Sequence, residues 1–137
     1  RRQRQMCIRD SIKAALTRTH TDPNDPERLL AALGGPEFAV LAGVCLGAAE
    51  AGSPVVLDGL ATSVAALIAT KFSPGLHGWL VASQASREQV HHIVLAELGL
   101  EALMELRMRA GEGVGACFGA QMILTGLQVR RTAARTC

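Results

Sequence analysis

The sequence predicts an α/β fold in which helices cover both faces of a parallel sheet. The 137-residue chain is 49% hydrophobic, which is enough for one core of ordinary size. Aromatic residues make up only 3% of the chain, a composition that suits helices packed closely on a sheet better than an antiparallel barrel. From residue 54 onward, short apolar runs alternate with helical patterns, and right-handed crossovers between such units give a parallel sheet.

The first part of the chain predicts helices only. A weak helical pattern over 12–16 is followed by a polar loop. Asp25-Pro26 then supplies an N-cap and a first helical residue, which predicts a helix over 26–33. Gly34-Gly35 ends that helix, and the small and apolar residues that follow predict another over 36–51.

Apolar runs that end in a polar residue predict strands buried on both faces. Pro54-Val-Val-Leu-Asp58 is such a run, and Trp79-Leu-Val-Ala-Ser83 repeats it, with Trp79 expected in the core. A third run, Leu103 to Met108, alternates less cleanly and precedes Gly111-Glu-Gly-Val-Gly115. In Rossmann-like order we expect strands over 54–58, 79–83 and 103–108, with helices over 60–72, over 86–98 and up to about residue 129.

The net charge of +2 conceals two regions of opposite sign. Nine of the basic residues lie within the first 18 or the last eight positions. Residues 19–129 contain five Lys or Arg against 11 Asp or Glu, so the body of the chain is acidic. An acidic body argues against nucleic acid as a partner, and we interpret the basic start as a solvated tail.

The apolar runs are too short for a membrane span. The longest, near 38–49 and 114–129, fall short of the roughly 20 residues that a bilayer requires, and the first twenty residues lack a signal-peptide run. The four cysteines have no Cys-x-x-Cys spacing, and we interpret them as reduced thiols. We therefore expect a cytoplasmic protein without membrane contact.

Candidate site residues gather at the predicted carboxyl ends of the strands, where ligands bind in open α/β sheets. They are Asp58-Gly59, Ser83 and Gly111-Glu112-Gly113. A carboxylate at the end of a buried strand must find donors or a ligand hydroxyl, but Asp58 and Ser83 can equally cap a helix. The glycines around Glu112 permit a tight turn, and its carboxylate either complements the helix end or acts beside a ligand held by free backbone N–H groups.

Two adjacent histidines, His91 and His92, point to different sides of their helix and do not form the i, i+4 pair of a metal site. We expect one to face solvent and the other to be hydrogen-bonded near the sheet. No metal site is predicted.

Four segments taken together resemble a known family: Gly34 to Gly43, Pro54 to Gly59, Ser83 to His91, and Leu98 to Gly115. They are similar to nicotinate-nucleotide:dimethylbenzimidazole phosphoribosyltransferases over about residues 12–129. The strand followed by Gly-Glu-Gly-x-Gly is the most specific piece. The resemblance lies in the C-terminal part of the family's catalytic domain.

The resemblance implies an activity and a set of roles. In the family, the Glu of Gly-Glu-Gly is the catalytic base, which falls on Glu112, flanked by Gly111 and Gly113. Asp58, Gly59 and Ser83 lie around the nucleotide. The implied reaction moves phosphoribosyl from nicotinate mononucleotide to dimethylbenzimidazole in cobalamin lower-ligand assembly, without a metal or other cofactor, and the full-length enzyme is expected to be a homodimer.

Some segments depart from the family pattern. Residues 1–11 do not match it, and we interpret them as a non-native leader before the catalytic segment 12–137. The family's phosphate-binding loop and its Lys are expected before residue 12, so we expect an incomplete domain that is inactive alone. Gln84 stands where the family usually has His. The alternatives are a non-catalytic α/β module that binds a nucleotide or assembles with a partner, and a phosphoryl-transfer enzyme, which lacks its Gly-Lys-Ser/Thr motif here.

Overall fold

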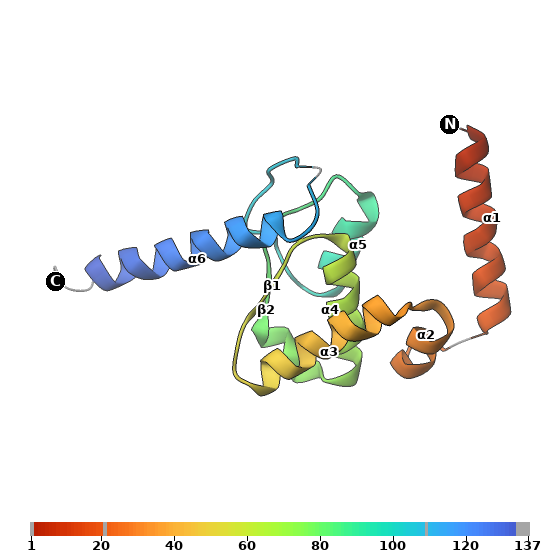
Figure 1. Ribbon diagram of the computed structural model, residues 1–137, viewed down its shortest axis with the longest axis horizontal. Coiled ribbons are helices and arrows are strands. Elements are labelled where there is room, and N and C mark those ends of the chain that lie inside the picture. Colours follow the sequence, from red (N-terminus) through yellow and green to blue (C-terminus); the bar gives the residue numbers. More distant parts are fainter. Residues whose placement is uncertain (1, 21, 109, 134–137) are drawn as a thin grey trace.

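The computed structural model describes residues 2–20, 22–108 and 110–133, and it places a small parallel sheet among helices (Figure 1). Strand β1 (Val55–Leu57) pairs in parallel with β2 (Leu80–Ala82), and Val56 lies opposite Val81. Both strands lie within the ranges predicted from the sequence. The connection between them is helix α4 (Leu60–Phe72) followed by a 3-10 helix, η1 (Pro74–Trp79).

Helices pack on both faces of the sheet, as predicted for the α/β class. Leu57 faces a core formed with α3 (Pro36–Glu50), α4 and α5 (Gln89–Glu97). The side chain of Val56 points to the other face, toward α6 (Val114–Ala133). The buried core consists of Ala42, Cys45, Leu57, Ala66, Ala69, Leu76, Leu80, Val94 and Leu98.

The helices before the sheet follow from local capping. Helix α2 (Pro26–Leu33) begins after Asp25, whose carboxylate accepts a hydrogen bond from the Arg28 N–H at 3.0 Å. An Asp N-cap with Pro at the first helical position is the predicted arrangement, and it is confirmed. None of the helices in the described part of the chain has the length and apolarity needed to cross a lipid bilayer.

The predicted third strand is wrong. The segment 103–108 contributes one isolated bridge, in which Gln84 pairs with Met104 beside the end of β2. Its first two residues still follow β2, because the Leu103 and Met104 N–H groups donate to the carbonyls of Ala82 and Ser83. The extended backbone cannot continue, because Arg107 adopts a left-handed conformation with φ of 51°.

Trp79 is also placed differently from the prediction. It ends η1 instead of opening β2, and 37% of its surface is exposed. The buried apolar residues of this stretch are Leu76, which precedes Trp79, and Leu80, which follows it. The apolar run therefore contains a turn of 3-10 helix that periodicity alone does not separate from a strand.

Helix α6 approaches the strand ends so closely that only glycine fits at one contact. A Cβ added at Gly119 would lie 2.7 Å from Ser83 Cβ, 3.2 Å from Ser83 Cα and 3.3 Å from Val56 Cγ1. Farther along the same helix, a Cβ at Gly126 would meet nothing within 4 Å. The helix is thus held against the sheet at its first turns and is free of such contacts beyond them.

We expect Gly119→Ala to destabilise the fold by about 1–3 kcal/mol, because backbone and strand side chains would have to move apart. Gly126→Ala is the matched control and should stabilise by about 0.5–1 kcal/mol through helix propensity alone. Urea denaturation of the two variants measures the difference. Equal stabilities would show that α6 does not lie against Ser83.

The segment set apart as a leader is helical. Residues 2–11 form one continuous helix with the following residues, α1 (Arg2–Thr19), which contacts α2 and lies apart from the sheet (Figure 1). Its apolar side chains are exposed: Met6, Ile8, Ile12 and Leu16.

We expect deletion of residues 1–11 to change the free energy of unfolding by less than about 0.5 kcal/mol, because exposed side chains contribute little to a core. Thermal unfolding of the truncated chain measures this change. A clear fall in melting temperature would contradict the interpretation of this segment as a dispensable leader.

Candidate active site

A cavity of about 1040 Å³ lies at the carboxyl end of β1, between the starts of α4 and α6. Five of the six residues predicted for the site line it: Asp58, Gly59, Gly111, Glu112 and Gly113. They come from two segments more than fifty positions apart in the chain. The structure therefore brings together the strand end and the glycine-rich turn.

Asp58 joins the two segments through its carboxylate. Its Oδ2 atom accepts from the Gly113 N–H at 3.3 Å, and its Oδ1 atom accepts from the Ala116 N–H at 3.1 Å. Gly113 directly precedes α6 and Ala116 lies in its first turn, where backbone N–H groups have no partner within the helix. Asp58 thus caps a helix distant in the chain and fixes the glycine-rich turn to the sheet.

The start of α4 does not need the Asp58 carboxylate. Thr62 Oγ1 accepts from the Asp58 and Gly59 N–H groups, each at 3.0 Å, and donates to the Gly59 carbonyl at 2.9 Å. Gly59 is held with its backbone on the cavity wall. The capping alternative for Asp58 is therefore correct, but for α6 instead of the helix that follows it.

Glu112 occupies a strained position at the rim of the cavity. Its φ is 62° and that of Gly113 is 83°, so both residues are left-handed. This conformation costs a residue other than glycine on the order of 1 kcal/mol, and such residues cluster at functional sites. Among the described residues, none donates a hydrogen bond to the Glu112 carboxylate, and Asp58 already complements the helix end.

The structure does not bring Ser83 into the cavity. Its side chain is fully buried beneath Gly119, and its hydroxyl donates to the Leu57 carbonyl at 2.6 Å. A weaker contact at 3.4 Å reaches the Asp58 carbonyl. Through these two contacts, Ser83 connects the end of β2 to the end of β1 and to the backbone of Asp58.

Gln84 belongs to the cavity wall, although the sequence did not select it. The side chain is only 3% exposed, and its Oε1 atom is buried without a hydrogen-bond partner among the described residues. The sequence feature that could have identified Gln84 is its position directly after Ser83, at the predicted carboxyl end of a strand. Its contact with α6 depends on tertiary packing, which the sequence pattern does not reveal.

His91 positions the loop that carries Gln84 and Arg87. The imidazole is buried, with Nδ1 accepting from the Ser86 N–H at 3.0 Å and Nε2 lying 3.0 Å from Ser63 Oγ. Because Nδ1 is an acceptor, the proton of the neutral ring is on Nε2, which donates to Ser63. His92 is exposed, so the predicted division between the two histidines is confirmed.

Burial lowers the pKa of His91, and the neighbouring His92 lowers it further, against the opposing effects of Asp58 and Glu88. Below about pH 6.5 the unfolded chain therefore binds a proton at His91 that the folded chain resists. Protonation would also break the hydrogen bond from Ser86.

We accordingly expect the melting temperature to fall as the pH is lowered below about 6.5. His91→Gln should reduce this slope, whereas His92→Gln, on the exposed side of the same helix, should largely retain it. Thermal unfolding from pH 8 to pH 5 measures all three proteins. The same slope in His91→Gln and the parent would contradict the assignment.

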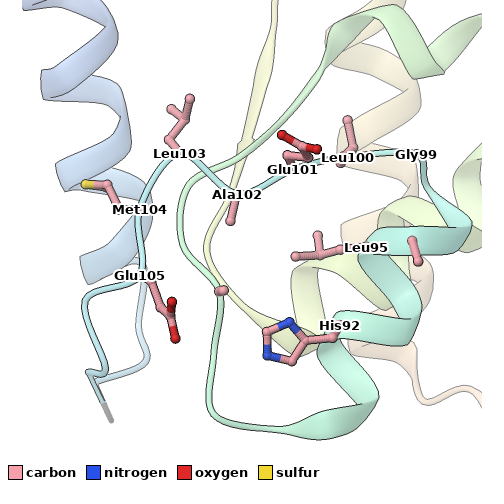
Figure 2. Close-up of a pocket in the computed structure, with 11 residues that line it drawn as sticks. His92, Leu95, Gly99, Leu100, Glu101, Ala102, Leu103, Met104 and Glu105 are labelled. Atoms are coloured by element: carbon pink, nitrogen blue, oxygen red, sulfur yellow. The ribbon is translucent and has the colours of Figure 1, made fainter.

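A second pocket of about 650 Å³ lies beside α5 and the loop that follows it. His92 faces this pocket from α5, and Glu101 and Glu105 lie on the loop (Figure 2). None of the predicted site residues lines it. Among its described lining residues, none has a buried polar atom without a partner. The larger cavity is therefore the candidate active site.

The charge of the larger cavity is mainly negative. Its described lining includes the carboxylates of Asp58, Glu88 and Glu112 and the guanidinium of Arg87. Such a wall favours a ligand atom that carries or gains positive charge. Across the described residues, no group of three or more His, Cys, Asp or Glu is arranged to hold a metal ion.

Comparison with known proteins shows the family to which the chain belongs. A family model described as Phosphoribosyltransferase matches residues 3–136, a range that includes both segments of the site and part of the expected leader. The chain belongs to this phosphoribosyltransferase family. A relative from Desulforudis audaxviator, named nicotinate-nucleotide--dimethylbenzimidazole phosphoribosyltransferase, is 41% identical over 119 residues, which are 87% of this chain and 34% of the relative.

Another relative and a solved structure match this chain with similar identity and coverage. The protein of that name from Mycobacterium tuberculosis is 42% identical over 114 residues, covering 83% of this chain and 31% of the relative. The crystal structure of CobT from Thermus thermophilus superposes with a TM-score of 0.77 at 39% identity, covering 83% of this chain and 34% of that one. The chain thus spans about a third of the length of these relatives.

Proposed function

We propose that this chain, within a full-length enzyme, transfers the phosphoribosyl group of nicotinate mononucleotide to 5,6-dimethylbenzimidazole. The products are α-ribazole 5′-phosphate and nicotinate, and the reaction serves cobalamin lower-ligand assembly in the cytoplasm. The observation that carries the proposal is the carboxylate of Glu112. It lies at the rim of the cavity in a strained turn, while Asp58 takes the structural role at the helix end.

The chemistry requires a proton acceptor but no redox step. One nitrogen of dimethylbenzimidazole attacks the anomeric carbon of the ribose, and the bond from that carbon to the nicotinate nitrogen breaks. The leaving nicotinate keeps the electron pair of the broken bond. The second benzimidazole nitrogen then gives its proton to the Glu112 carboxylate, and general-base assistance of this kind typically accelerates a reaction by roughly 10² to 10⁴.

The other cavity residues support the nucleotide in this proposal. Positive charge builds on the ribose as nicotinate leaves, and the Asp58 carboxylate lies in the cavity wall to stabilise it. The backbones of Gly59, Gly111 and Gly113 let the sugar approach closely. Ser83 is buried and bonded to the Leu57 carbonyl, so in this proposal it supports the strand ends and does not contact the nucleotide directly.

We further propose that the full-length enzyme is a homodimer. Helix α6 leaves several large apolar side chains exposed: Phe118, Met122, Leu124, Leu127 and Val129. Apolar surface of this kind is characteristic of interfaces. The remaining part of the polypeptide and a second subunit are the surfaces that we expect to cover it.

Product formation tests the proposed activity. A full-length hybrid is made by joining the chain from residue 12 onward to the preceding part of the Thermus thermophilus relative. We expect the hybrid to form α-ribazole 5′-phosphate from the two substrates, detected by chromatography and mass spectrometry. A folded hybrid without product would overturn the proposal. The alternative, a non-catalytic module, predicts a rise in melting temperature with the nucleotide but no turnover.

A further inference from the structure

Gln84 carries an unmet hydrogen-bonding requirement in the wall of the cavity. Its side chain is only 3% exposed, and Oε1 has no partner among the described residues. Most buried polar groups in folded proteins are hydrogen-bonded, because an unpaired one loses its water without compensation. The amide oxygen accepts hydrogen bonds and cannot donate them, so a partner must bring an O–H or N–H group.

The Gln84 side chain lies next to Asp58 at the start of α6. A Cβ added at Gly115 would lie 2.6 Å from Gln84 Nε2 and 2.8 Å from Asp58 Oδ1. The two polar side chains therefore lie side by side against the first turn of α6, on the wall of the same cavity. Glycine at position 115 is what leaves room for both.

We propose that Gln84 is a substrate-binding residue whose Oε1 accepts a hydrogen bond from a ribose hydroxyl of the bound nucleotide. This inference rests on the proposed function. The benzimidazole offers a single N–H group, which is the proton that Glu112 removes. The sugar hydroxyls are then the donors left for the Oε1 atom of this cavity-lining residue.

Gln84→Met tests the proposal, because Met has similar length but cannot accept this hydrogen bond. In the full-length hybrid, we expect KM for nicotinate mononucleotide to rise about tenfold or more, with KM for dimethylbenzimidazole and kcat changed little. The melting temperature without substrate should not fall, because the substitution removes an unpaired buried acceptor. Gln84→His, which supplies a ring nitrogen, should restore much of the affinity. Gln89→Met, at an exposed position nearby, should behave like the parent.

A lowered melting temperature with unchanged KM for the nucleotide would overturn the inference and give Gln84 a purely structural role. A rise in KM confined to dimethylbenzimidazole would also overturn it. If the parent hybrid binds the nucleotide without turning it over, the proposed reaction is wrong. The inference about Gln84 is then tested by binding alone. In that case calorimetric titration with nicotinate mononucleotide must show weaker binding to Gln84→Met than to the parent.

Discussion

Replacing Glu112 by Gln should lower kcat of the full-length hybrid by roughly 10² or more while KM for both substrates changes little. Gln preserves the size of the side chain and can still hydrogen-bond, but it cannot take the benzimidazole proton. The melting temperature should stay near that of the parent, because Asp58 and not Glu112 holds the helix end. Steady-state kinetics and thermal unfolding of the same samples provide both measurements.

Glu105→Gln is the matched control for the loss of a carboxylate. Glu105 precedes the glycine-rich turn on the same connecting segment, but it lines the second pocket (Figure 2). Its substitution should leave kcat near the parent value. Nearly normal turnover in Glu112→Gln with a fall in stability of about 0.3–1 kcal/mol would assign Glu112 to the structural role instead.

Asp58→Ala should lower both stability and turnover. The substitution leaves the Gly113 and Ala116 N–H groups without their acceptor and removes the connection between β1 and the turn that carries Glu112. Loss of an N-cap typically costs about 0.5–2 kcal/mol. We expect kcat to fall at least about tenfold in addition, because a misplaced base loses the benefit of positioning.

Asp25→Ala separates these two effects. Asp25 caps α2 through the Arg28 N–H and does not line the cavity. It should lower stability by a similar amount without lowering kcat. Chemical denaturation and kinetics of the two variants are compared, and equal kcat values would show that Asp58 acts only as a cap.

Features set by short-range rules were predicted well. Asp25 with Pro26 determines the start of α2, and the run before Asp58 predicts β1. The same rules wrongly predicted a third strand over 103–108. The left-handed backbone of Arg107 ends the extended segment, and no residue pattern predicts that conformation. Most of the residues predicted for the site line one cavity for a physical reason, since the carboxyl ends of parallel strands meet at one edge of a sheet.

Features that depend on packing between distant segments were not predicted. The sequence predicted Ser83 as a polar residue at the open end of a strand, but the close approach of Gly119 on α6 buries its side chain. Gln84 enters the cavity wall only because Gly115 leaves room beside Asp58. The capping of α6 by Asp58 joins residues 58 positions apart, and a capping rule based on neighbours in the chain cannot find it.

The role of Glu112 as proton acceptor is tested most directly by chemical rescue of Glu112→Gly in the full-length hybrid. Glycine suits the left-handed backbone at this position, so the turn should remain intact. Formate then supplies a carboxylate that is not attached to the chain. We expect the lost turnover to return in part and to increase with formate concentration until it saturates, with no such effect on the parent. A variant that folds and binds both substrates but does not respond to formate or to acetate would contradict the assignment of Glu112 as the base.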